Sequence, residues 1–123
     1  MNGVLVFNTY HGLIKKPTRM VIRNNRIVEF EKTRNGNIIK KILSADKNAR
    51  YAAEFAIGTN EKAKLIYNIL QDEKIIGTCH IAFGTNISFR GRRKSKVHID
   101  LMLFKPTIRV NDRVVMRDGK PKW

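Results

Sequence analysis

The chain has 123 residues, 42% of them hydrophobic, and 25 Lys and Arg residues against 10 Asp and Glu residues give it a formal net charge of +15 at pH 7. This length suits a single domain, and the hydrophobic fraction excludes disorder of the whole chain. Cys79 is the only cysteine, which excludes intrachain disulfides and thiolate zinc clusters. The sequence has no apolar run long enough for a membrane span and no basic leader, so we expect a soluble cytoplasmic protein.

The first part of the chain predicts strands and one short helix. Residues 4–7 are an apolar run typical of a buried strand. Residues 19–31 predict a hairpin, because two β-rich stretches flank Asn24 and Asn25, and asparagine tolerates the left-handed backbone of such turns. Residues 37–44 have their isoleucines and leucine at helical spacing, which predicts an amphipathic helix of about two turns.

The second part predicts three further strands, at residues 52–58, 78–83 and 97–104, and a hairpin at 107–116. A helix is expected from residue 61 towards 70, capped by Asn60 and with an apolar stripe formed by Leu65, Ile66, Ile69 and Leu70. Altogether we expect one α+β domain over residues 1–123, with a mostly antiparallel sheet of about six or seven strands and two short helices.

His98 and Asp100 form the most specific local pattern in the chain. On a strand, residues two apart face the same side, so this imidazole and this carboxylate converge. Both groups are suitable ligands for zinc and similar divalent metals. The pattern alone leaves two interpretations open, a metal site and a structural hydrogen-bonded pair.

His80 and Glu54 stand out on two other predicted strands. His80 shares its face with Thr78 and Ala82, whose small side chains leave room for a ligand. Glu54 interrupts an otherwise apolar stretch, and a buried carboxylate is costly unless it is paired or bound to metal. Taken singly, His80 also suits a hydrogen-bonded core histidine, and Glu54 also suits a salt bridge to one of the many basic residues.

Four segments together resemble a known family. The stretches A-E-F-A-I-G-T-N, D-E-K, G-T-C-H-I-A-F-G and S-x-x-H-I-D follow one another in the order and spacing of that family's motifs; they are Ala53–Asn60, Asp72–Lys74, Gly77–Gly84 and Ser95–Asp100. The chain therefore resembles the C-terminal part of the aminopeptidase T family, the leucyl-aminopeptidase-like thermophilic metallopeptidases. The resemblance is strong over residues 52–119 and weak over residues 1–51.

The resemblance implies a metal-dependent aminopeptidase domain that hydrolyses N-terminal residues from peptides. Family members hold two divalent cations with acids and histidines, and the matching positions here are Glu54, His80, His98 and Asp100. The implied cofactor is up to two ions of zinc, cobalt or manganese, and the implied partner is a peptide substrate. Neither catalytic residues nor a general base are assigned.

Two departures from the family pattern stand out. Family members are much longer, and they take a further glutamate ligand from a segment that nothing before Glu54 matches. Ile87 occupies the position of a family tyrosine. These departures lead us to expect a truncated or split form with weak metal binding and reduced or absent activity alone, and with a separate N-terminal chain or a homo-oligomer as partner.

The alternative interpretation is a non-catalytic basic module that binds nucleic acid. Five basic residues gather in the polar loop that follows residue 89: Arg90, Arg92, Arg93, Lys94 and Lys96. Charge of this kind suits weak, sequence-independent nucleic-acid binding, and Phe89 is placed to stack on a base. No recognised nucleic-acid motif accompanies this charge, and a metal measurement separates the two interpretations.

Overall fold

The computed structural model describes residues 1–123, except for the side chain of Ile69. Nine strands, two α-helices and one 3₁₀ helix follow one another in the described chain. Their bounds in chain order are β1 Gly3–Phe7, β2 Thr18–Arg23, β3 Arg26–Phe30, α1 Arg34–Ile42, β4 Ala52–Ile57, α2 Ile69–Asp72, β5 Thr78–Gly84, η1 Ile87–Phe89, β6 His98–Phe104, β7 Ile108–Val110, β8 Arg113–Arg117 and β9 Lys120–Pro121. No described helix has the length and apolarity that crossing a membrane requires.

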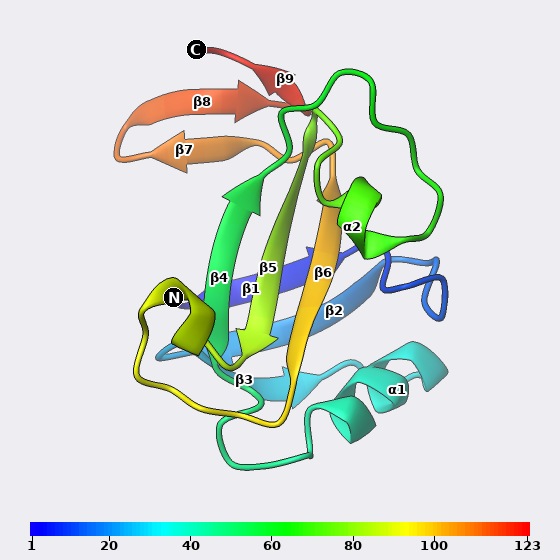
Figure 1. Cartoon of the computed structure of the whole chain (residues 1–123), viewed down its shortest axis with the longest axis vertical. Helices are drawn as coiled ribbons and strands as arrows, with labels where there is room; N and C mark the ends of the chain where they lie inside the picture. The colour runs from blue at the N-terminus through cyan, green and yellow to red at the C-terminus, as the bar shows by residue number, and fades with distance from the viewer.

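The strands form three small sheets, β1-β2-β3, β4-β5-β6 and β7-β8-β9, and all of their pairs are antiparallel. The prediction of α+β structure with mostly antiparallel pairing is confirmed, but the expected sheet of six or seven strands is wrong. The first sheet crosses behind the second, as Figure 1 shows. Each of these two sheets buries an apolar face against the other, which edge-to-edge pairing in a single sheet would leave exposed.

The core lies between the first two sheets and under α1. Phe7, Ile22 and Ile27 of the first sheet pack in one cluster with residues of β5 and β6, and Ile39 joins them from α1. The members contributed by β5 and β6 are Ile81, Phe83, Ile99 and Leu101. Because these four face the core, the alternate residues of the same strands are turned to the opposite face of the sheet.

Two local predictions are confirmed, one of them with a shifted boundary. Asn24 and Asn25 turn the β2–β3 hairpin with positive φ angles of 51° and 64°. The helix predicted at residues 37–44 is α1, which begins earlier, at Arg34. Thr33 sets that start as N-cap, because its hydroxyl oxygen accepts a hydrogen bond of 3.2 Å from the backbone N–H of Gly36.

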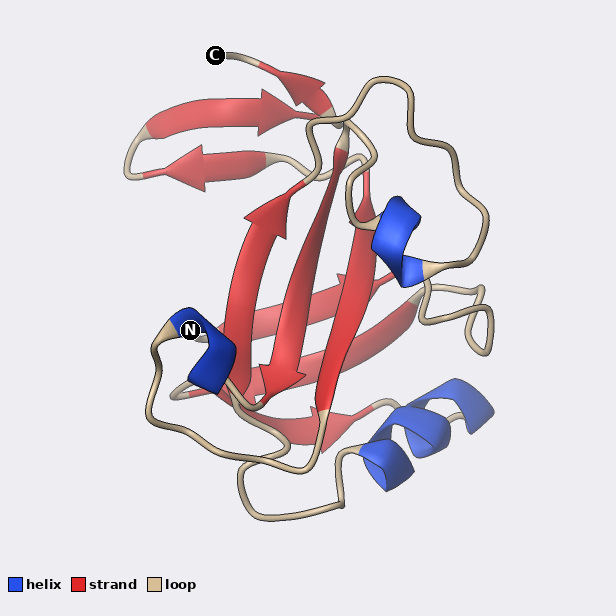
Figure 2. Cartoon of the chain, viewed as in Figure 1, coloured by secondary structure: helices blue, strands red, loops and turns tan.

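The helix predicted from residue 61 towards 70 is wrong, since this segment is turn and loop up to the short α2. Side chains satisfy its backbone instead: Asn60 accepts a bond of 2.9 Å from the N–H of Lys62, and Asp72 accepts one of 2.9 Å from the N–H of Ile66. Leu65, Ile66 and Leu70 of the expected apolar stripe are exposed, and the side chain of Ile69 lies outside the described part. The loop carries α2 and the residues after it across the second sheet (Figure 2).

Candidate metal centre

Three neighbouring strands bring the predicted ligands to one face of the second sheet. Glu54 lies on β4 opposite Ala82 of β5, and Ala82 in turn lies opposite Asp100 of β6. His80 and His98 come from β5 and β6 on the same face. Only the small side chain of Ala82 therefore lies between the carboxylates of Glu54 and Asp100. The residues of β5 and β6 that face the core fix the backbones of these strands.

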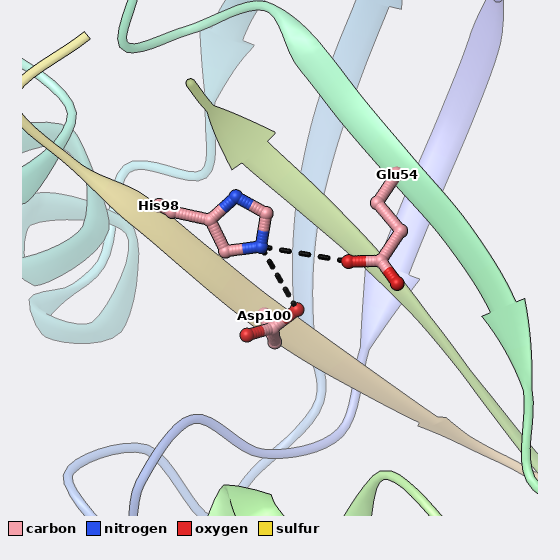
Figure 3. A group of neighbouring side chains, drawn as sticks. All are labelled: Glu54, His98 and Asp100. Atoms are coloured by element: carbon pink, nitrogen blue, oxygen red, sulfur yellow. Dashed lines mark ion pairs between the residues drawn. The ribbon is translucent and has the colours of Figure 1, made fainter. Parts of the chain in front are cut away.

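Glu54, His98 and Asp100 point at one another (Figure 3), and His80 lies beside the same two carboxylates. His80 Nε2 lies 3.5 Å from Glu54 Oε1 and 3.7 Å from Asp100 Oδ1. His98 Nε2 lies 3.5 Å from Glu54 Oε2 and 3.5 Å from the same Asp100 Oδ1. Among the described residues Glu54 pairs with the two histidines and not with a Lys or Arg, so the salt bridge to a basic residue that the sequence left open is not found.

These separations suit donors arranged around an ion. They exceed the usual 2.7–3.2 Å of an N–H···O hydrogen bond. Ligand atoms that each lie about 2.1 Å from a tetrahedral ion are about 3.4 Å apart. The spacing between the imidazoles and the carboxylates is therefore close to the spacing that a shared divalent ion imposes.

Glu73 is a further donor that the sequence prediction missed as a ligand. Donor atoms of Glu54, His98 and Asp100 lie within 4.8 Å of one another, and so do donor atoms of Glu73, His80 and Asp100. Asp100 belongs to both groups. The sequence marks Glu73 only as part of the D-E-K motif; in the structure it directly follows α2, and its carboxylate lies near His80 and Asp100.

The environment of His98 fixes which of its nitrogens faces the carboxylates as an acceptor. Its Nδ1 lies 2.9 Å from the carbonyl oxygen of Thr85. A carbonyl only accepts, so Nδ1 carries the proton and donates, which leaves the lone pair on Nε2. A lone pair aimed at Glu54 and Asp100 requires either a cation between them or a second proton on the ring, and the first of these is the usual arrangement of a metal-bound histidine.

His80 shows a second sign of an unmet partner. Its side chain is only 6% exposed, and its Nδ1 is buried without a hydrogen-bond partner among the described residues. A buried imidazole nitrogen left unpaired costs about 1–3 kcal/mol. Nε2 is the nitrogen that lies beside Glu54 and Asp100, so an ion at these carboxylates would bind Nε2, and Nδ1 would need a different partner such as an ordered water. The fit to a divalent cation comes from the donor set itself, imidazoles and carboxylates gathered on one sheet face.

Burial shapes the titration of the groups around the centre. Desolvation raises the pKa of Asp100, opposed by the nearby His98 and His80 and reinforced by the carboxylates of Glu73 and Glu54. Desolvation and, second, the charge of Asp100 raise the pKa of Tyr10, so its phenol stays protonated beside the centre. Two acidic neighbours around a half-buried carboxylate make this face of the sheet locally negative, although the chain as a whole is strongly basic.

Cys79 is not part of this face. It is buried, and desolvation raises the pKa of its thiol to about 11. A thiol that stays protonated at neutral pH is a poor metal ligand. Cys79 therefore behaves as a small buried hydrophobe.

Asp46 fixes the segment that precedes His98 in the chain. Asp46 accepts hydrogen bonds from the backbone N–H of Lys96, at 2.7 Å, and from the hydroxyl of Ser95, at 2.9 Å. These bonds, with the one from Lys96 first, lower the pKa of Asp46. Ser95 belongs to the S-x-x-H-I-D motif, and its contact shows why that position carries a hydroxyl: it anchors the chain just before β6.

Histidine and carboxylate donors that converge on one sheet face define the class of protein as a candidate metalloenzyme. The family model described as "Thermophilic metalloprotease (M29)" matches residues 2–121. The chain belongs to this thermophilic metalloprotease family, which confirms the family predicted from its motifs.

Individual relatives agree with this assignment. Aminopeptidase AmpS of Bacillus subtilis (strain 168) is 24% identical over 132 residues, which cover 91% of this chain and 31% of AmpS. The chain thus spans about a third of the length of that curated relative.

Two solved structures share the fold. The 2,5-dihydroxypyridine dioxygenase of Pseudomonas putida KT2440 superposes with a TM-score of 0.85 at 16% identity, over 98% of this chain and 40% of the dioxygenase. Wild-type AmpT of Thermus thermophilus superposes with a TM-score of 0.68 at 21% identity, over 99% of this chain and 36% of AmpT. At these identities the likeness establishes the fold alone.

Proposed function

We propose that this chain is the metal-binding part of a metal-dependent aminopeptidase that removes N-terminal residues from peptides. One observation carries the proposal: Asp100 belongs to two donor groups, each with one histidine and one glutamate. A carboxylate shared in this way is suited to bridge two divalent ions, and family membership makes peptide hydrolysis the reaction to test.

Each residue has a stated part in this proposal. Glu54 and His98 would hold one ion, Glu73 and His80 would hold the other, and Asp100 would be shared between the two groups. Bound ions of this kind polarise the scissile carbonyl and lower the pKa of a bound water. Thr85 orients His98 through its carbonyl, and the core face of β5 and β6 keeps the donors in register.

The donor atoms also bear on the identity of the ion. Imidazole nitrogens and carboxylate oxygens suit zinc, cobalt and manganese, and the described donor groups contain no thiolate or thioether to favour a softer ion. Glu73 adds a carboxylate to the four donors predicted from the sequence. It thereby supports tighter metal binding than the sequence prediction of a site short of one acid.

The substrate and the partner belong to the same proposal. The curated relative AmpS is named an aminopeptidase, and this chain covers 31% of it. We expect reduced or absent hydrolysis by the 123-residue chain alone. Under this proposal a separate N-terminal chain, or a second copy of this one, completes the surface that positions the peptide.

A second candidate function follows from a subset of the same donors. His80 Nε2 and His98 Nε2 lie 3.7 and 3.5 Å from one oxygen of Asp100. Two histidines and one carboxylate around one point are the donor set of mononuclear non-haem iron oxygenases. The dioxygenase of Pseudomonas putida, which shares the fold, makes a single ferrous ion the alternative to a dinuclear hydrolase.

Nucleic-acid binding by the basic loop stays a prediction. The structure adds that this loop is anchored, because Asn48 donates a hydrogen bond of 2.8 Å to the carbonyl oxygen of Lys94, and Asp46 binds Ser95 and Lys96. Neither contact selects a nucleic acid. We therefore keep it below the two metal-dependent candidates.

Glu73→Gln separates the dinuclear hydrolase from the mononuclear alternative. Under the proposed function, metal content after loading with manganese, cobalt or zinc is two ions per wild-type chain and one in Glu73→Gln, because only the group of Glu73, His80 and Asp100 is impaired. Mass-spectrometric metal analysis gives the counts, and an aminoacyl-substrate assay accompanies it.

The matched control is Glu29→Gln, an exposed glutamate on β3 of the other sheet, which should keep two ions. One ferrous ion per chain, unchanged in Glu73→Gln, would instead support the oxygenase. A wild-type chain that binds no divalent metal would refute both metal-dependent candidates.

A further inference from the structure

An aromatic side chain stands exposed at the rim of the candidate metal centre. The ring centroid of Phe89 lies 5.8 Å from that of His98, with the planes tilted by 31°. Phe89 is nevertheless 54% exposed, so about half of its surface faces solvent next to His98, a proposed metal ligand. His98 itself is 26% exposed, which leaves the rim open to a bound molecule.

The loop that carries Phe89 is fixed by hydrogen bonds to one residue. The carbonyl oxygen of Asn86 accepts bonds of 3.0 Å from the N–H groups of both Phe89 and Gly91, and the side-chain oxygen of Asn86 accepts one of 2.8 Å from the N–H of Arg93. The turn requires glycine at position 91, because a Cβ there would lie 2.1 Å from the Asn86 side chain. The ring is thus presented by an ordered turn.

The same turn is tied to the metal centre. Thr85, next to Asn86, accepts the Nδ1–H of His98 through its carbonyl oxygen at 2.9 Å, and its own N–H donates to Val97 at 2.9 Å. The hydrogen bonds of Thr85 and Asn86 therefore fix the turn that carries Phe89 relative to His98. Ordered apolar surface beside a polar centre is the composition of a ligand pocket, in which polar groups orient the ligand and apolar walls select it.

On these grounds we propose that Phe89 is a specificity-determining residue, whose ring contacts the side chain of the first residue of the substrate. This inference rests on the proposed function, because the proposed function places the first residue of the peptide at the candidate metal centre of Glu54, His98 and Asp100. An apolar or aromatic first residue covers the exposed ring and gains from the contact, whereas a glycine gains nothing.

The test measures binding and needs no turnover. The full chain is loaded with manganese, and the dissociation constants of phenylalanine hydroxamate and glycine hydroxamate are measured by calorimetry; both carry the same metal-binding group. We expect phenylalanine hydroxamate to bind about two- to twelvefold more tightly, the range of a single aromatic contact. In Phe89→Ala this ratio should fall to about one while the affinity for glycine hydroxamate is retained, and Phe89→Tyr should restore the ratio.

Phe55→Ala is the matched control. Phe55 is 49% exposed and lies next to Glu54 on β4, but it faces the other side of the strand. This variant should keep the wild-type ratio. A ratio unchanged in Phe89→Ala, with glycine hydroxamate still bound, would overturn the role of Phe89 and leave the proposed function standing, whereas a metal-loaded wild type that binds neither hydroxamate would overturn both.

Discussion

Asp100→Asn is expected to abolish divalent-metal binding at both donor groups, with affinity at least about 100-fold weaker than in the wild type. The reason is that Asp100 is the one residue common to the group of Glu54 and His98 and to the group of Glu73 and His80. An amide has no charge and one acceptor oxygen, so it cannot bridge two cations. Calorimetric titration with manganese measures the loss.

Asp112→Asn is the control for this variant. Asp112 is exposed in the turn between β7 and β8, and its loss should leave the titration unchanged. Circular dichroism of both variants checks that each is folded. Wild-type affinity in a folded Asp100→Asn chain would show that the ions are held elsewhere.

Phe83→Ala is expected to lower the free energy of unfolding by about 3–5 kcal/mol. Phe83 is fully buried on β5 and belongs to the cluster that joins the first two sheets. Its removal leaves a cavity directly behind the strand that carries His80. Urea denaturation in the presence of a chelator measures this change without the contribution of bound metal.

Phe55→Ala again provides the comparison, because it removes the same side chain from a half-exposed position. Its cost should be about 0.5 kcal/mol, as for surface positions in general. A loss below about 1 kcal/mol in Phe83→Ala would mean that the two sheets do not depend on this cluster.

The strand periodicity was sufficient to predict much of the centre. A spacing of two on one strand puts His98 and Asp100 on one face, and the apolar alternate residues of β5 and β6 identify the opposite face as the core. The motifs then indicated Glu54 and His80. None of these patterns specifies the register between strands, which is what sets Ala82 between Glu54 and Asp100.

Other features depend on contacts that no local pattern encodes. The segment before α2 has the apolar spacing of a helix, but side-chain hydrogen bonds from Asn60 and Asp72 stabilise a loop in its place. Glu73 directly follows the short α2, and no local pattern specifies the chain path that brings its carboxylate near His80 and Asp100. The sequence also does not specify how many strands share one sheet. An apolar strand face can pack either against a second sheet or under a helix, so the same pattern fits one large sheet or several small ones.

The most direct measurement is the anomalous scattering of zinc in crystals of the chain. The account predicts two anomalous peaks per chain, each about 2.0–2.2 Å from an oxygen of Asp100, with His98 and Glu54 around one and His80 and Glu73 around the other. Zinc found only at surface carboxylates, with no peak beside Asp100, would contradict the account.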